Sequence, residues 1–173
     1  MEQNKSNLLR YEFAYGHIRG FSCAYRDWDG SSHNEESALL HGYALSFFFR
    51  VLVPDHEILE KFKATISSLI ENYLEAVFRN TVLVAKDDPA LDAFVALEAA
   101  GACDLRINDK VGLNAFARDL HAEFFPLIKS HTEDQFLLYD VSIAENGNCG
   151  ASFIDTTVTD SGPPEMALVP VSG

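Results

Sequence analysis

Alternating apolar and polar side chains predict two long strands near the start of the chain. Residues 8–25 alternate loosely, and Gly16 and Gly20 interrupt the pattern, which predicts a strand that is bulged or bent there. Residues 39–53 are more continuously apolar and contain three successive phenylalanines at 47–49. Aromatic residues on both faces of one strand predict that both faces are covered, one by the core and one by a neighbouring subunit.

The period then changes from two to about 3.6 residues, which predicts helices. Asp55 has the place of an N-cap, and apolar residues recur at spacings of three and four over residues 58–77. A shorter helix is predicted to begin at Asp88 and Pro89, with Pro89 in its first position, and to end near Gly101.

The helical period returns over residues 111–125, where apolar side chains again follow one face. Two further strands are predicted over residues 136–145 and 151–158, and the Asn-Gly-Asn sequence at 146–148 predicts the turn that joins them. The remaining residues, 160–173, are rich in turn-forming side chains and are expected to form a loosely ordered tail.

The order of these elements predicts the fold class. Two strands, two main helices and two strands indicate an α+β domain over residues 1–159, in which helices cover one face of an antiparallel sheet. Short extended stretches at 82–85 and 105–107 lie between the helices. A chain of 173 residues is long enough for one such domain with a substantial core.

The amino-acid composition indicates which classes of partner and which cellular compartment to expect for this protein. Hydrophobic residues make up 47% and charged residues 23% of the chain, as in ordinary globular proteins. The formal net charge of -13 disfavours nucleic acids and anionic membrane surfaces as partners. Cys23, Cys103 and Cys149 are too widely spaced for a metal or redox pair, which favours a reducing compartment. Without a signal-peptide core or an apolar run of roughly 20 residues, a cytoplasmic protein is expected.

Two segments far apart in the chain carry a family resemblance. The first reads Phe-Ser-Cys-Ala-Tyr at 21–25 followed by Leu-His-Gly-Tyr at 40–43, and the second reads Leu-Tyr-Asp-Val-Ser-Ile-Ala-Glu at 138–145. Together they resemble the 6-pyruvoyl- and 6-carboxytetrahydropterin synthase family of zinc lyases. The resemblance implies the tunnelling fold, with the order β-β-α-α-β-β, and a homo-oligomer whose subunits join their sheets into a barrel. It also implies a pterin or purine-like ligand.

The zinc ligands of that family are replaced here in part. The family holds zinc with three histidines, in Phe-Ser-Ala-Ala-His and in His-Gly-His, where this chain has Tyr25, His41 and Tyr43. Tyrosine binds zinc as phenolate, and its ordinary pKa of about 10 opposes that form. Little zinc is therefore expected. In a second possible register the first strand slides, His17 faces His41 in a metal site, and His33 adds a third nitrogen.

The family's catalytic groups are also replaced. Ser37 stands where the family has the cysteine that transfers protons, and a serine hydroxyl is too weak a base for that role. In some members that cysteine comes later, and the matching position here is Leu113. The family's Asp-His pair after the first long helix corresponds to Arg79 and Asn80.

Glu145 is the functional residue that the chain keeps. The resemblance implies that this glutamate binds the pterin ring, and a carboxylate offers the two acceptors that an amino-pyrimidine edge requires. Alternation along the strand predicts that Glu145 shares the face of Val141 and Ile143 and is drawn inward. Tyr25 and Tyr43 are expected to line the same ligand site.

Three functions are compatible with this pattern. The first is a metal-dependent lyase that eliminates triphosphate from a dihydroneopterin triphosphate-type substrate. The second is a binding protein for a pterin or related base, without the metal. The third is a non-catalytic structural paralogue that assembles with an active subunit.

Overall fold

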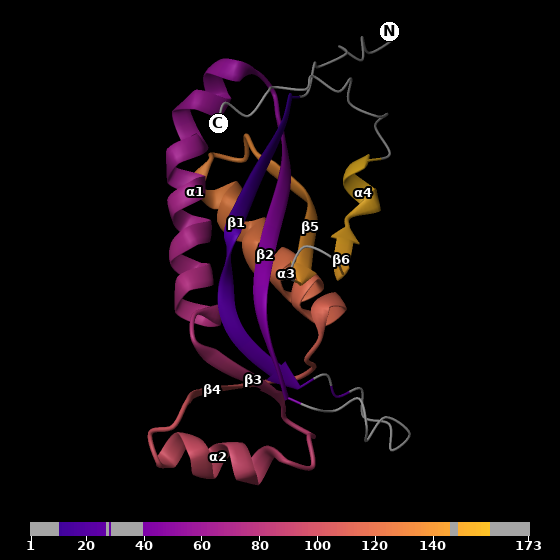
Figure 1. Cartoon of the computed structure of the whole chain (residues 1–173). Coiled ribbons are helices and arrows are strands. Elements are labelled where there is room, and N and C mark those ends of the chain that lie inside the picture. Colours follow the sequence, from indigo (N-terminus) through magenta and orange to yellow (C-terminus); the bar gives the residue numbers. More distant parts are fainter. Residues whose placement is uncertain (1–10, 27, 29–39, 146–148, 160–173) are drawn as a thin grey trace, which may run out of the picture.

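The computed structural model describes residues 11–26, 28, 40–145 and 149–159 (Figure 1). For residues 11–22, 41–43, 149, 158 and 159 it describes the backbone alone. The turn predicted at 146–148 and the tail predicted at 160–173 lie outside the described residues.

One open six-stranded sheet forms the centre of the molecule, in the order β4-β3-β1-β2-β5-β6. The neighbouring pairs β1–β2, β2–β5 and β5–β6 are antiparallel, whereas β3 runs parallel to both β1 and β4. The strands are β1 (Tyr11–Arg26), β2 (Leu40–Val53), β3 (Thr81–Ala85), β4 (Asp104–Asn108), β5 (Leu137–Glu145) and β6 (Cys149–Ile154).

The fold is therefore mixed α+β, and the prediction of a purely antiparallel sheet is wrong. The two short extended stretches of the sequence become β3 and β4, which extend the sheet beside β1. Each is reached through a helix, and a crossover connection of that kind is what allows parallel pairing. The sheet does not close within one chain, so the oligomeric barrel stays a prediction.

The first strand is bent as the glycines predicted. The register of the β1–β2 ladder shifts between His17 and Phe21, and Gly20 lies inside that shift. At the other end of the chain the prediction of a strand to residue 158 is wrong. Strand β6 ends at Ile154, and the short helix α4 (Thr156–Thr159) follows.

The long helix α1 (His56–Phe78) begins where the sequence indicated. The side chain of its N-cap residue, Asp55, accepts a hydrogen bond of 2.9 Å from the backbone N–H of Ile58. Every fourth residue of one stripe is buried against the sheet, which confirms the amphipathic pattern. The buried residues are Phe62, Ile66, Ile70, Leu74 and Phe78.

The other two main helices differ from prediction at one boundary each. Helix α2 (Leu91–Ala99) begins after Ala90, so Pro89 lies in the preceding turn rather than in the first helical position. Asp88 fixes that turn, since its carboxylate accepts a 2.7 Å hydrogen bond from the Ala90 N–H. Gly101, with φ of +71°, ends α2 as predicted.

Helix α3 (Leu113–His131) passes through Pro126, where the sequence had predicted an end. A proline inside a helix costs about 3 kcal/mol or more. Phe124 and Ile128 lie on the same buried stripe on either side of it and are fully buried. Packing of that stripe against the sheet outweighs the cost of the proline.

The helices α1 and α3 cover one face of the sheet, as predicted (Figure 1). Alternate residues of β2 on that face are no more than 1% exposed, and their rings contact the helices. The Phe47 ring lies 4.7 Å from that of Phe78, and the Phe49 ring lies 5.0 Å from that of Phe124. The residues buried in this way are Leu45, Phe47, Phe49, Val51 and Val53.

The opposite face of the sheet carries a polar cluster. Asp140 is 1% exposed and pairs with Arg50 of β2. The Ser142 hydroxyl donates to Asp140 at 3.1 Å, and its oxygen lies 2.7 Å from that of Ser152. This cluster gives the buried carboxylate of Asp140 its charge partner and hydrogen bonds.

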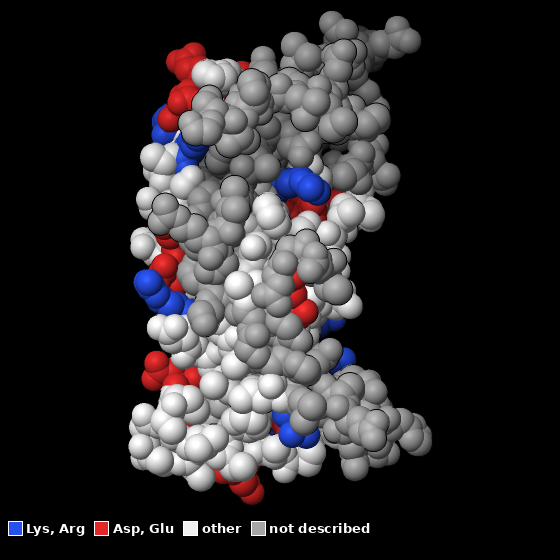
Figure 2. All heavy atoms as spheres, in the orientation of Figure 1, with Lys and Arg blue, Asp and Glu red and all other residues white. Residues whose placement is uncertain are grey.

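At the end of the molecule, α2 packs on β3 and β4 and leaves part of its surface apolar. Val95 and Leu97 are 43% and 47% exposed, and Figure 2 shows mainly uncharged atoms over this end. Within the described residues, no helix is both long and apolar enough to cross a membrane.

Phe124→Ala tests the one-sided core. The Phe124 ring touches both Phe49 and Tyr73, so its removal should lower the free energy of unfolding by about 3–5 kcal/mol, measured by urea titration. Phe125→Ala is the matched control because Phe125 is only half-buried, and it should cost less. Equal losses would show that α3 does not bury the Phe124 face.

Candidate functional site

The β1–β2 ladder brings the two halves of the first motif together. In its register Tyr25 lies opposite His41, and Cys23 lies opposite Tyr43. The end of β5, at Glu145, pairs with β2 two residues beyond Tyr43. The segments that carry the family resemblance therefore converge at one end of the sheet.

Glu145 lies on the helix-covered face of the sheet. It pairs with Leu45, which is fully buried, and it continues the row formed by the pairs Val141–Phe49 and Ile143–Phe47. The prediction that Glu145 shares the face of Val141 and Ile143 is confirmed. Burial raises the pKa of the Glu145 carboxyl above its ordinary value.

Cys23 is a neighbour of this carboxylate that the sequence analysis missed. Its side chain is 4% exposed, and burial, followed by the negative charge of Glu145, raises the pKa of the thiol to about 12. The thiol is therefore protonated at neutral pH and lies within the electrostatic field of Glu145. The sequence did contain a signal for this position of Cys23. Cys23 lies two residues before Tyr25 on one strand, so the two side chains share a face, whereas the spacing between cysteines says nothing about it.

Tyr25 is part of the core. Its side chain is 4% exposed, and its ring meets that of Phe116 edge to face, with centroids 5.5 Å apart. Phe116 in turn contacts Phe78 at 5.7 Å. This packing links the end of β1 to α1 and α3. The role of Tyr25 as a ligand contact stays a prediction, as does that of Tyr43, whose side chain is outside the description.

The register does not bring His17 opposite His41. His17 pairs with Phe47, six positions along β2 from His41, a separation of roughly 20 Å at about 3.3 Å per residue. The alternative in which the strand slides requires a different ladder from the one observed. His33 lies outside the described residues.

The donor types at this end of the sheet differ from the three histidines of the resembling family. One histidine, one cysteine and two tyrosines occupy the paired positions, so tyrosine stands at two of the three positions where the resembling family has a zinc-binding histidine. Among the side chains that the structure describes, no group of three or more His, Cys, Asp or Glu residues could hold a metal ion.

The positions that match the family's catalytic pair form a turn. Asn80 has a left-handed φ of 55° between α1 and β3, and Arg79 pairs with Glu75 on the last turns of α1. Leu113, where some members have the catalytic cysteine, is the first residue of α3 and packs against the core. These residues serve chain reversal and packing.

A buried ion pair holds the elements beside this site. Arg26, which follows Tyr25 at the end of β1, lies with its Nε 2.8 Å from a carboxylate oxygen of Asp88. The Asp88 side chain is fully buried and also fixes the turn before α2. The pair therefore joins the end of β1 to the start of α2, and no sequence pattern indicated it.

Comparison with solved structures finds this fold elsewhere. An uncharacterized protein, WS1659, from Wolinella succinogenes is 14% identical and superposes with a TM-score of 0.61, over 85% of this chain and 99% of that one. The 6-pyruvoyltetrahydropterin synthase of Plasmodium vivax, as a catalytic-residue mutant, has 13% identity and a TM-score of 0.47, over 83% and 96% of the two chains. The Plasmodium falciparum synthase has 11% identity and a TM-score of 0.46, with the same coverage.

No protein-family model matches the chain, and no curated protein matches it. At 14% identity the WS1659 structure establishes a shared fold and nothing about activity.

The donor set generates a prediction about metal content. Purified protein dialysed against buffer at neutral pH should contain well below one zinc per chain by elemental analysis, because two of the three family ligands are tyrosines. Stoichiometric zinc that is lost in His41→Ala would contradict this expectation.

The raised pKa of Glu145 generates a prediction about stability. The folded state binds this proton more tightly than the unfolded state does, so the contribution is present at low pH and is lost as pH rises through the folded-state pKa. Relative to wild type, Glu145→Gln should therefore gain stability as the pH rises from about 4, the ordinary pKa of glutamate, through the folded-state pKa, measured in urea titrations. Glu71→Gln, on the exposed surface of α1, should show no such trend. A pH-independent difference for Glu145→Gln would mean that the carboxyl is fully hydrated.

Proposed function

We propose that this protein binds a pterin or a related amino-pyrimidine base through Glu145. The observation that carries the proposal is a partly desolvated carboxylate at the end of β5, on the face that the helices cover. Most glutamates at strand ends are hydrated, so a glutamate that is partly desolvated on the helix-covered face requires a reason.

A ligand that donates two hydrogen bonds supplies that reason. The amino group and the neighbouring ring N–H of a pterin form a planar pair of donors, and the two carboxylate oxygens accept them side by side. Removing water from around the carboxylate strengthens such a charge-assisted pair. The buried rings near this strand end, including Tyr25, leave it in apolar surroundings that suit a flat heterocycle.

The proposal is a binding protein without the lyase activity of the resembling family. The family's proton-transfer cysteine is replaced by Ser37 or Leu113, and its Asp-His pair by Arg79 and Asn80. The described members of this set take part in a turn and in packing, which supports binding without catalysis.

A cytoplasmic homo-oligomer is part of the proposal. The sheet is open, and both of its edge strands carry an exposed isoleucine: Ile107 of β4 is 51% exposed and Ile154 of β6 is 52% exposed. Open edges with apolar side chains favour pairing with another chain.

Titration calorimetry with biopterin and neopterin, and with guanosine as a purine probe, tests the ligand. Wild type should bind at least one of them, and Glu145→Gln should weaken that binding roughly tenfold to a hundredfold. The factor follows from a charge-assisted hydrogen-bonded pair of about 1.5–3 kcal/mol, since 1.4 kcal/mol is a factor of ten.

Glu71→Gln is the matched control, since it removes the same charge from an exposed helix position and should bind as wild type does. The proposal fails if no probe binds to wild type, or if Glu145→Gln and wild type bind equally well.

A further inference from the structure

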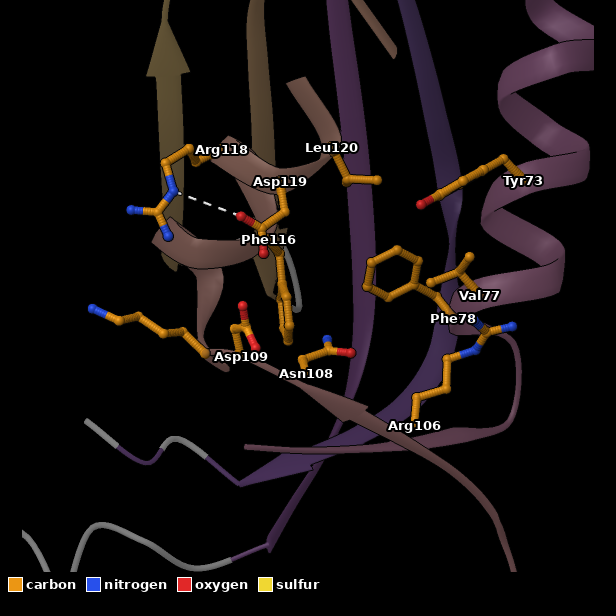
Figure 3. Close-up of a pocket in the computed structure, with 11 residues that line it drawn as sticks. Tyr73, Val77, Phe78, Arg106, Asn108, Asp109, Phe116, Arg118, Asp119 and Leu120 are labelled. Carbon is orange, nitrogen blue, oxygen red and sulfur yellow. Dashed lines mark ion pairs between the residues drawn. The ribbon is translucent and has the colours of Figure 1, made fainter. Parts of the chain in front are cut away.

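A hollow lies away from Glu145, between the end of α1, strand β4 and the start of α3 (Figure 3). Its volume is about 550 Å³, within the range of roughly 300–1,000 Å³ that is usual for small-molecule sites. None of the residues on which the proposed pterin site depends lines it. The inference below is therefore independent of that proposal.

The floor of this hollow is apolar and aromatic. Phe78, Phe116 and Leu120 are 2–3% exposed, and the two rings meet at 82° with centroids 5.7 Å apart. Val77 and Tyr73 of α1 continue this wall. Because those three side chains are almost wholly buried, the apolar surface that the hollow offers a ligand comes from the half-buried Val77 and Tyr73, which are held in place by the core beneath them.

The charges around the floor differ in sign from the chain as a whole. Arg106, Lys110 and Arg118 line the hollow together with Asp109 and Asp119, whereas the chain has a net charge of -13. Each aspartate already has a basic partner: Asp109 lies 2.8 Å from Lys86, and Asp119 lies 3.6 Å from Arg118.

Two of the three basic side chains that line the hollow are not paired with either aspartate. Among the described residues neither Arg106 nor Lys110 has a carboxylate partner. Arg106 is held in place by a 2.7 Å hydrogen bond from its Nη2 to the Ala76 carbonyl in the last turn of α1. That bond uses one of five guanidinium donors, so the others remain available to a ligand.

Neutral donors add to this set. The Tyr73 hydroxyl points into the hollow, and the Asn108 amide lies at its lower side (Figure 3). Burial, followed by the charge of Glu123, raises the pKa of Tyr73, which keeps the hydroxyl protonated and able to donate.

We infer that this hollow binds a planar aromatic anion, with an aromatic carboxylate as the ligand class. The ring lies against the half-buried side chains of Val77 and Tyr73, the carboxylate accepts hydrogen bonds from Arg106, and the positive charge of Lys110 adds to the attraction. Arginine is suited to carboxylates because its planar fork donates two parallel hydrogen bonds. The overall negative charge of the protein does not prevent this, since salt screens distant charges beyond about 8 Å.

Two probes with the same ring and opposite charge test the inference: 2-naphthoate and 2-naphthylmethylammonium. Calorimetry on the full chain should detect binding of the anion and at least tenfold weaker binding of the cation. Amide shifts in two-dimensional NMR should move in β4 and at the start of α3. Added salt should weaken the binding of naphthoate.

Arg106→Gln and Lys110→Gln should each weaken naphthoate binding roughly tenfold. Lys129→Gln, near the other end of α3, and Glu145→Gln should leave it unchanged. Lys110 is exposed and has no recorded partner in the described structure, so its variant keeps the test valid if Arg106→Gln disturbs the contact with α1. Three results would each overturn the inference. The first is equal affinity of the protein for the two probes, and the second is unchanged naphthoate affinity in Lys110→Gln. The third is displacement of bound naphthoate by inorganic phosphate at the same concentration at which unlabelled naphthoate displaces it.

Discussion

The long antiparallel pairing of β1 with β2 is the constraint on which the rest of the structure depends. Its ladder runs from Tyr11 opposite Val53 to Arg26 opposite Leu40 and contains one register shift. Side chains alternate across a strand, so a slip of one residue would move Leu45, Phe47 and Phe49 from the helix-covered face to the other face. Their burial under α1 and α3 therefore fixes the register, and the register fixes every relationship at the end of the sheet.

The same pairing explains why the end of the sheet combines core packing with ionisable groups. Tyr25 and Cys23 lie on β1 where the helices still cover the sheet, so both side chains are buried. Glu145 ends a row of buried residues on β5, and its negative charge helps to raise the pKa of the Cys23 thiol. A carboxylate in such a position costs free energy without a partner, and this cost underlies both its pH-dependent stability and the proposed ligand.

The two proposed sites use opposite chemistry. The end of β5 presents an acceptor to a ligand that donates, whereas the hollow beside β4 presents arginine, lysine, tyrosine and asparagine donors to a ligand that accepts. One lies at a strand end, and the other lies between the end of α1 and the start of α3. Both use aromatic residues of a single core as their apolar wall.

Periodicity and local chemistry were sufficient to predict much of this molecule from its sequence. The strand pattern, the Asp55 cap of α1, the bend near Gly20, the end of α2 at Gly101 and the inward face of Glu145 all depend on neighbours within a few residues. Such features follow from side-chain alternation, helix capping and backbone freedom, which a single sequence contains.

Only the tertiary structure decided the features that join distant segments. The parallel places of β3 and β4, the continuation of α3 through Pro126 and the pairing of Tyr25 rather than His17 with His41 depend on how the helices pack on the sheet. The Arg26–Asp88 pair and the hollow around Arg106 likewise bring together residues far apart in the chain. Their energies arise from burial and charge in three dimensions, so no local pattern in the sequence predicts them.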